Sequence, residues 1–187
     1  KNIWIINHYA MPPEYEVRVR NNMMAKYLQK SGYNVKIFAA STIHNTNINL
    51  IEDKKTLFIE RSYEGLNFVH IRTSNYEGNG ISRIINMLEF PLRFFRVAKK
   101  IDERPDAIIC DLTTVFAILP YWISKYYKCK FILEVRDLWP ESIVVYMGLS
   151  KKNPIIWALY KLEKWIYKKA DKLVFTMEGG KDYIIDK

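Results

Sequence analysis

Hydrophobic residues occur in short runs that alternate with longer segments whose apolar positions are three or four residues apart. An uninterrupted short run is typical of a buried strand, and the longer spacing is typical of an amphipathic helix. Strands are predicted at 3–6, 35–40, 57–59, 68–71, 107–110, 131–135 and 173–175. Helices are predicted at 17–30, 81–101, 115–127 and 154–170, and a further helix is predicted to begin after residue 177.

Two segments carry more specific signals. Glu64 and Gly65 lie between the strands at 57–59 and 68–71, which predicts a hairpin. The helix at 81–101 has the clearest apolar row, formed by Ile81, Ile85, Leu88, Leu92, Phe95, Ala98 and Ile101. Pro91 is expected to kink this helix or divide it in two.

Five or six apolar strands separated by helices predict one α/β domain. We expect a Rossmann-like, doubly wound, mostly parallel sheet with helices on both faces. Such folds bind their ligands at the carboxyl ends of the strands. The loops after Ile6, Cys110 and Val135 are therefore expected to carry the site.

The loop after Ile6 lacks a G-x-G-x-x-G or P-loop pattern, and Pro12 and Pro13 stand where glycines would be needed. Binding of NAD or ATP by this loop is therefore not expected. Its polar and aromatic residues can contact a sugar or a phosphate, and the candidate substrate-binding residues are His8, Tyr9, Glu14, Arg18 and Arg20. The two arginines face different sides of a helix, so one ion-paired and one solvated arginine is an equal alternative to a phosphate site.

The loop that follows Val135 is rich in charge. Glu134, Arg136, Asp137 and Glu141 surround a Trp-Pro pair at the end of a buried strand. Charged groups at such a position are costly unless they are paired or functional. A structural ion pair of Arg136 with Glu134 or Asp137 is the alternative to a catalytic role.

The composition restricts the class of protein. The 187 residues are 49% hydrophobic, which excludes a disordered chain, and 29 basic against 20 acidic residues give a net charge of +9. Nucleic acid, anionic lipid and phosphorylated substrates are all compatible partners. Cys110 and Cys129 have no motif spacing, which predicts a reducing compartment and no zinc site. No apolar run reaches membrane-spanning length, so a cytoplasmic location is expected.

Three segments resemble retaining glycosyltransferases of family four, which have the GT-B fold. The most specific is Glu134-Val-Arg-Asp-Leu-Trp-Pro-Glu-Ser142, which is similar to the bacterial enzymes that build O-antigen and capsular polysaccharide. Residues 20–35 resemble the first helix of the family and its entry into the second strand. Residues 170–176 resemble the strand that closes the N-terminal domain.

The resemblance implies that residues 1–187 are the N-terminal, acceptor-side domain, and that the donor-binding C-terminal domain is absent from this chain. Asp137 and Arg136 then become the candidate catalytic residues and Glu141 a candidate acceptor-binding residue. Arginine stays protonated at neutral pH, so Arg136 would act electrostatically on a phosphate and not as a base. The implied partners are a nucleotide sugar and a lipid-linked or oligosaccharide acceptor, with no metal or other cofactor.

The helix at 81–101 also carries basic residues beside aromatic ones, a pattern found in helices that lie on anionic membranes. The candidate membrane-surface residues are Arg83, Arg93, Phe94, Arg96, Lys99 and Lys100. A core stripe with a solvated face, or contact with the missing domain, is the alternative. With a lipid-linked acceptor, peripheral binding to the inner face of the cell membrane is expected.

Two other functions compete with sugar transfer. A basic, non-catalytic module for nucleic acid or anionic ligands is compatible with the charge, but no nucleic-acid motif is present and no nucleic-acid partner is expected. A sugar-nucleotide epimerase would need the glycine fingerprint that is absent here.

Overall fold

The structure is a computed structural model that describes residues 1–15, 20–44, 46–78, 80–113, 115–148, 150 and 152–185. Its elements are β1 (Asn2–Ile6), α1 (Arg20–Lys30), β2 (Asn34–Ala40), β3 (Phe58–Tyr63), β4 (Leu66–Ile71), α2 (Ile81–Val97), the short 3-10 helix η1 (Ala98–Lys100), β5 (Ala107–Cys110), α3 (Ile118–Tyr127), β6 (Lys130–Val135), α4 (Glu141–Met147), α5 (Pro154–Lys169), β7 (Lys172–Phe175) and α6 (Gly180–Ile185).

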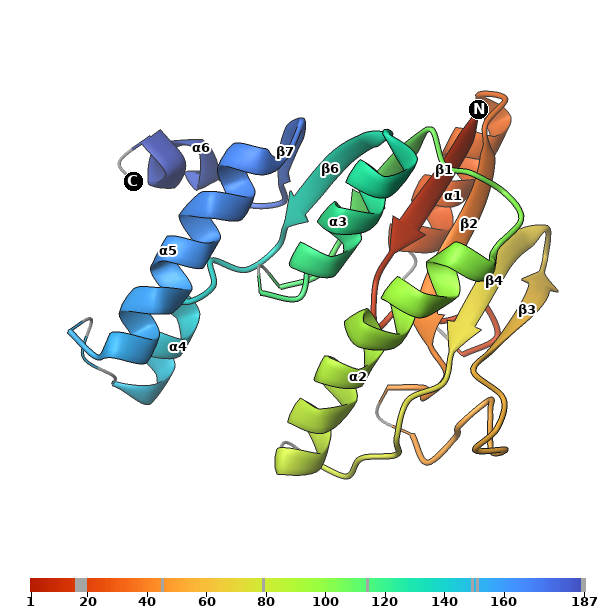
Figure 1. Cartoon of the computed structure of the whole chain (residues 1–187), viewed down its shortest axis with the longest axis horizontal. Coiled ribbons are helices and arrows are strands. Elements are labelled where there is room, and N and C mark those ends of the chain that lie inside the picture. Colours follow the sequence, from red (N-terminus) through yellow and green to blue (C-terminus); the bar gives the residue numbers. More distant parts are fainter. Residues whose placement is uncertain are drawn as a thin grey trace.

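The strands form one sheet in the order β3-β4-β2-β1-β5-β6-β7 (Figure 1). Every neighbouring pair is parallel except β3 and β4, which are antiparallel. The order proceeds outward from β1 in both directions, which is the mark of a doubly wound sheet. The prediction of a Rossmann-like, mostly parallel α/β fold is confirmed.

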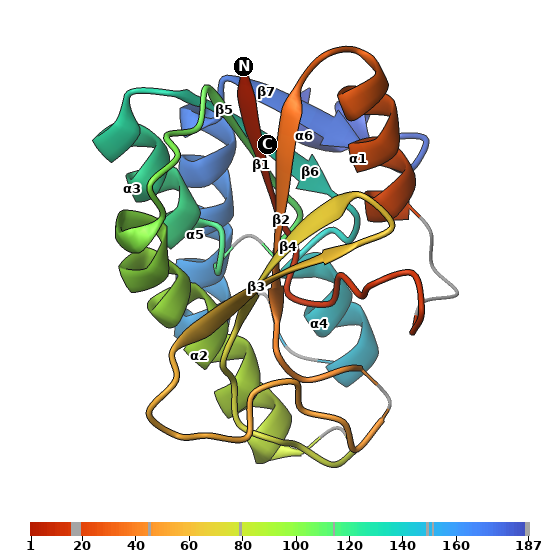
Figure 2. The same ribbon diagram turned by 90° about the vertical axis from the view of Figure 1, so that its right-hand side faces the viewer.

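Alternate residues of the strands supply two cores, one on each face of the sheet. Trp4, Phe38 and Val69 pack against α2, α3 and α5 on one face. Ile5 and Ile37 pack against α1 on the other. Figure 2 shows α1 on one side of the sheet and α2, α3 and α5 on the opposite side. Burial of both faces explains why the central strands are continuous apolar runs.

The turn between β3 and β4 is the predicted one. Glu64 and Gly65 both have positive φ angles, 49° and 79°. Two consecutive positive φ values match the twist of a two-residue hairpin turn, and glycine adopts this conformation without steric cost. The hairpin places β3 at the edge of the sheet, antiparallel to β4.

Several predicted boundaries are corrected. α4 was not predicted, and residues 115–117 form turns ahead of α3 rather than its first turn. Val17 lies outside the described residues, and the described part of α1 begins at Arg20. Pro91 lies inside α2 without ending it, and the predicted long helix changes to η1 only after Val97.

Most of the apolar row predicted for α2 lies on the solvent-exposed face of the helix, and a different set of apolar residues packs in the core. Phe90, Phe94 and Val97 point into the core and are completely buried. Four members of the predicted row are exposed on the outer face together with Ile84: Ile81, Ile85, Leu88 and Leu92. Ala98 and Ile101 of the predicted row lie beyond the end of α2 and are buried. The spacing identified the helix correctly, but the helix has two apolar faces, and only one of them packs on the sheet.

Buried histidines make the stability of the fold sensitive to acid. Burial lowers the pKa of His70, on β4, to about 4. Between pH 6.5 and 4 the unfolded chain therefore takes up a proton that the folded chain does not, so stability falls as the pH falls. This one side chain should cost about 2 kcal/mol of unfolding free energy between about pH 7 and pH 5.

Urea unfolding of the His70→Phe variant at these two pH values measures the effect. Phenylalanine keeps a ring beside Phe68, against which His70 stacks, and does not titrate. We expect the variant to lose less stability than the wild type on acidification. His8 and the carboxyl groups contribute equally to both proteins, so an equal loss would contradict the prediction.

Candidate functional site

A pocket of about 460 Å³ opens at the carboxyl ends of β1, β5 and β6. It lies where the strand order reverses, the position at which open α/β sheets bind ligands. Its volume falls within the range of about 300–1,000 Å³ that is typical of ligand sites. The polar residues that line it are Asn7, His8, Tyr9, His44, Arg83, Asp111, Thr113, Glu134, Arg136, Asp137, Tyr167 and Thr176.

Asp111 follows β5 and has its side chain held from two sides. Asn7 Nδ2 donates a hydrogen bond to Asp111 Oδ2 over 2.7 Å, and Arg136 Nη1 donates to the same oxygen over 3.1 Å. Burial raises the pKa of Asp111 to about 6, although Arg136 opposes this shift. Oδ1, the second carboxylate oxygen, accepts no hydrogen bond from the other described side chains. Asp111 therefore combines a fixed orientation with an oxygen that can receive a ligand hydroxyl.

A second carboxylate, Glu134 at the end of β6, is paired with an arginine from the other end of the sequence. Arg20 Nε at the start of α1 donates to Glu134 Oε1 over 2.7 Å. Glu134 is almost completely buried, whereas about half of the Arg20 side chain is exposed. This bond is the main reason that the pKa of Arg20 is raised. Each of these two carboxylates is thus paired with a guanidinium group, Glu134 with Arg20 and Asp111 with Arg136.

His8 follows β1 and is a neutral imidazole at physiological pH. Burial lowers the pKa of His8 to about 4, and the nearby Asn86 opposes this shift only in part. Neither ring nitrogen makes a hydrogen bond within the described chain. The ring packs edge-on against Tyr9 and Phe90. A buried nitrogen without a partner at the wall of a pocket is costly unless a ligand satisfies it.

The rim of the pocket is aromatic and basic. Arg83 Nε of α2 donates to Tyr9 Oη over 3.2 Å, and the guanidinium lies 5.6 Å from the centre of the Tyr9 ring. The ring of His44 packs against the Tyr9 ring at a centroid distance of 4.7 Å, and its Nδ1 is 2.6 Å from Tyr76 Oη. A neighbouring cavity of about 460 Å³ shares His44 and Arg83 with the pocket. The two hollows therefore meet at this rim.

The structure brings four of the predicted catalytic and substrate-binding residues to the pocket: His8, Tyr9, Arg136 and Asp137. Arg20 reaches it indirectly through Glu134. Arg136 pairs with Asp111, not with Glu134 or Asp137 as the structural alternative expected. Glu14 is exposed in a turn away from the pocket lining, Arg18 lies outside the described residues, and Glu141 accepts a hydrogen bond from Tyr160 Oη at the start of α4.

The prediction of a membrane-surface position is wrong for two residues. Phe94 is completely buried in the core, because it lies on the face of α2 that packs on the sheet. Arg93 belongs to an internal polar network. It donates to Glu89 and to the carbonyl oxygen of Arg72. Of the other four, Arg83 lines the pocket, whereas Arg96, Lys99 and Lys100 are exposed.

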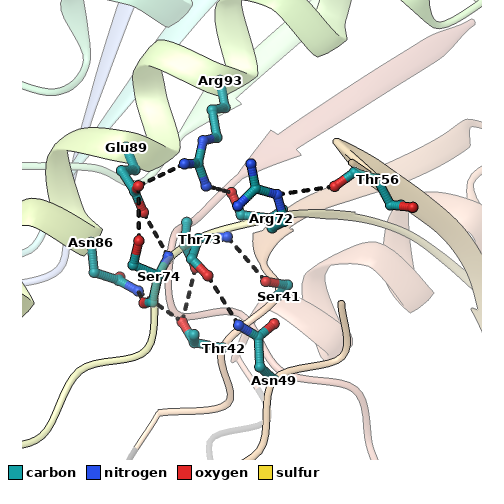
Figure 3. Close-up of polar contacts among 10 residues, drawn as sticks. All are labelled: Ser41, Thr42, Asn49, Thr56, Arg72, Thr73, Ser74, Asn86, Glu89 and Arg93. Carbon is teal, nitrogen blue, oxygen red and sulfur yellow. Dashed lines mark hydrogen bonds and ion pairs between the residues drawn. The ribbon is translucent and has the colours of Figure 1, made fainter. Parts of the chain in front are cut away.

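This network fastens α2 to the loops that follow β2 and β4 (Figure 3). Glu89 accepts from the backbone and hydroxyl of Ser74 as well as from Arg93. Asn86 donates to Thr42 Oγ1 and to the Ser74 carbonyl oxygen. The side chains of Asn86, Glu89 and Arg93 are thus directed inward, which fixes the helix beside the pocket.

Sequence reasoning missed several residues of the pocket. Asp111 lies directly after a predicted strand, in a loop that was expected to carry chemistry, so its position was a usable signal. Asn7 was likewise visible as a polar residue at the end of β1. His44, Arg83 and Tyr167 reach the pocket from a long loop and from two helices, and nothing in their local sequence indicates this.

A larger cavity of about 670 Å³ lies between α5 and α6, lined mainly by apolar groups, and it contains none of the predicted site residues. In the described part of the chain no three His, Cys, Asp or Glu residues are grouped as a metal site would require. No helix there has both the length and the apolar character needed to cross a bilayer.

Fold and site together define a Rossmann-like α/β domain with a polar pocket at its switch point, of the kind that forms half of a GT-B glycosyltransferase. The glycosyl transferase 4-like domain family matches residues 16–187. Because this match covers most of the sequence, the chain belongs to that family.

UGT89C1 from Arabidopsis thaliana, in complex with UDP, superposes with a TM-score of 0.52 and 9% identity, covering 98% of this chain and 47% of that one. The FeoB G-domain from Methanococcus jannaschii gives a TM-score of 0.26 and 15% identity, covering 93% and 83%. The chain therefore spans about half the length of UGT89C1, and the likeness is one of fold. No curated protein matches the chain.

Proposed function

We propose that this chain is the N-terminal, acceptor-side half of a retaining glycosyltransferase. The complete enzyme would move a sugar from a nucleotide sugar to a hydroxyl group of a lipid-linked saccharide, in the synthesis of a bacterial cell-surface polysaccharide. The observation that carries the proposal is the pocket around Asp111, in a chain that belongs to a glycosyl transferase family. The motif at 134–142 supports the retaining, polysaccharide-building branch.

The donor half would lie outside this chain. The match to only 47% of UGT89C1 supports this division. UDP in that structure makes a nucleotide sugar a reasonable donor class. The pocket at the strand ends would then form one wall of a cleft between two domains, with Asp137 at its exposed margin.

Within this pocket, Asp111, His8 and Arg136 would each contact a different group of the substrates. Asp111 Oδ1 would accept a hydrogen bond from the attacking hydroxyl and orient it, while Asn7 and Arg136 hold the carboxylate in place. A second hydroxyl of the acceptor would form a hydrogen bond with one of the two unpaired ring nitrogens of His8. Arg136, half exposed toward the pocket, would attract the phosphate that develops negative charge as it departs.

Retention of configuration requires that the hydroxyl attacks from the face on which the phosphate leaves. The bond between the anomeric carbon and the phosphate oxygen breaks, the bond to the acceptor oxygen forms, and the acceptor proton passes to the departing phosphate. The protein would contribute position and charge, and no step is assigned to a metal.

The experiment is transfer of radiolabelled sugar by the full-length protein. Nucleotide sugars are supplied one at a time with a bacterial lipid extract, and label in the lipid fraction is counted. Asp137→Ala should lower incorporation by about tenfold or more, because a charged group at the cleft margin is lost. Asp182→Ala, an exposed aspartate of α6 outside the pocket, serves as the control. Wild-type turnover by Asp137→Ala would refute the catalytic role of Asp137. If none of the nucleotide sugars supplied labels the lipid fraction, the proposed function is refuted.

A further inference from the structure

In the described part of the chain, the outer face of α2 presents an exposed aliphatic row. The row consists of Ile81, Ile84, Ile85, Leu88 and Leu92, and their exposed fractions range from 45% to 76%. In Figures 1 and 2 the N-terminal half of this helix projects beyond the carboxyl ends of the strands. A row of this length is costly to leave in water and marks an interaction surface.

Four polar residues of α2 lie outside this aliphatic row. Asn86, Glu89 and Arg93 are turned into the network of Figure 3, and Arg83 is turned toward the pocket. Glu89 is the one acidic residue in the sequence of α2. The exposed face is therefore free of negative charge along its whole length.

The same face becomes basic at the carboxyl end of the helix. Arg96, Lys99 and Lys100 are exposed there. Lys99 Nζ lies 4.1 Å from the centre of the Phe95 ring and 5.3 Å from that of Tyr126, an exposed tyrosine of α3. Aliphatic residues in a row, followed by cationic and aromatic groups, match a bilayer interface in which lipid tails lie beside anionic headgroups.

We propose that the aliphatic row of α2 inserts into the surface of an anionic membrane, with Arg96, Lys99 and Lys100 at the headgroups. Charge complementarity selects this occupant over a second copy of this basic chain, since like charges at the end of the helix would oppose each other. The inference also deepens the proposed function on which its biological meaning rests. Arg83 and Met87 of the same helix line the pocket, so docking would bring the pocket to a lipid-linked acceptor.

Co-sedimentation of the full-length protein with vesicles tests the proposal. The probe is a mixture of phosphatidylcholine and phosphatidylglycerol, compared with phosphatidylcholine alone. Wild-type protein should bind the anionic vesicles more tightly, and binding should weaken when salt is raised from about 0.1 to about 0.5 M. The Ile84→Glu/Leu88→Glu variant should bind at least about tenfold more weakly, because it places two carboxylates in the inserted face.

The control variant is Met23→Glu/Tyr27→Glu. It makes the same kind of change at two exposed positions of α1, on the opposite face of the sheet, and should bind as the wild type does. Thermal unfolding should be unchanged in both variants, because all four side chains are exposed.

Three results would overturn the proposal: absence of wild-type binding, equal binding by the α2 variant, or equal binding to neutral and anionic vesicles. Sedimentation velocity adds a fourth. A wild-type dimer that the α2 variant converts to a monomer would make the row a contact between copies. Vesicle binding needs no sugar transfer, so this proposal and the proposed function can fail independently.

Discussion

Replacing Asp111 by asparagine should lower the rate of sugar transfer by about 10²-fold or more while the protein stays folded. Asparagine has the same size, but its amide has no negative charge with which to orient and polarise the acceptor hydroxyl. The variant also loses the charge-assisted hydrogen bond that Arg136 Nη1 donates to Asp111 Oδ2 over 3.1 Å in the wild type. The measurement is incorporation of labelled sugar at saturating acceptor lipid, with Asp102→Asn, an exposed aspartate outside the pocket, as the control.

The same carboxyl group should govern the pH dependence of the rate. With a pKa of about 6, Asp111 is ionised above that pH and protonated below it. Transfer by the wild type should therefore rise as the pH increases through about 6, and this step should disappear in Asp111→Asn. A variant with a near-normal rate and an unchanged pH profile would show that Asp111 is only a structural partner of Asn7 and Arg136.

Phe94→Ala should reduce the free energy of unfolding by about 3–5 kcal/mol. Phe94 is completely buried, and its ring packs edge-on against Phe38 at a centroid distance of 5.2 Å. Truncation removes this contact and leaves a cavity that a close-packed core cannot refill. Urea denaturation measures the loss.

Leu92→Ala is the matched control, two residues away on the same helix. Leu92 is 58% exposed, so its truncation should change stability by no more than about 0.5 kcal/mol. Equal losses in the two variants would contradict the assignment of the two faces of α2. The pair also separates folding from membrane binding, because only Leu92 belongs to the aliphatic row.

The strands and most helices could be predicted because each is specified locally. Runs such as Ile3–Ile6 carry the signal of a strand buried on both faces, and Glu64-Gly65 carries that of a hairpin turn. α4 could not be predicted in this way, since its seven residues are too few to show a helical repeat. The sequence alone also did not show which face of α2 packs on the sheet. Phe90, Phe94 and Val97 form a second apolar row, and only the sheet decides which row is buried.

The location of the site could be predicted, but its internal pairing could not. Parallel strands bring the loops after β1, β5 and β6 to one edge, so His8, Arg136 and Asp137 were expected there. The partners of the charged groups come from distant segments: Arg20 and Glu134 are separated by 114 positions in the sequence. Such pairings depend on the order of strands in the sheet, which a single sequence does not reveal.

The β3–β4 hairpin has a consequence for the behaviour of the protein in concentrated solution. β3 is an edge strand, and its outer residues Glu60, Arg61 and Ser62 are exposed and polar. Glu60 also pairs with Lys36 of β2 over 2.8 Å. Unpaired backbone groups on a bare edge would recruit strands from other molecules, and charged side chains on that edge oppose such recruitment. The polar edge strand of the hairpin therefore disfavours the addition of strands from other molecules at this side of the sheet.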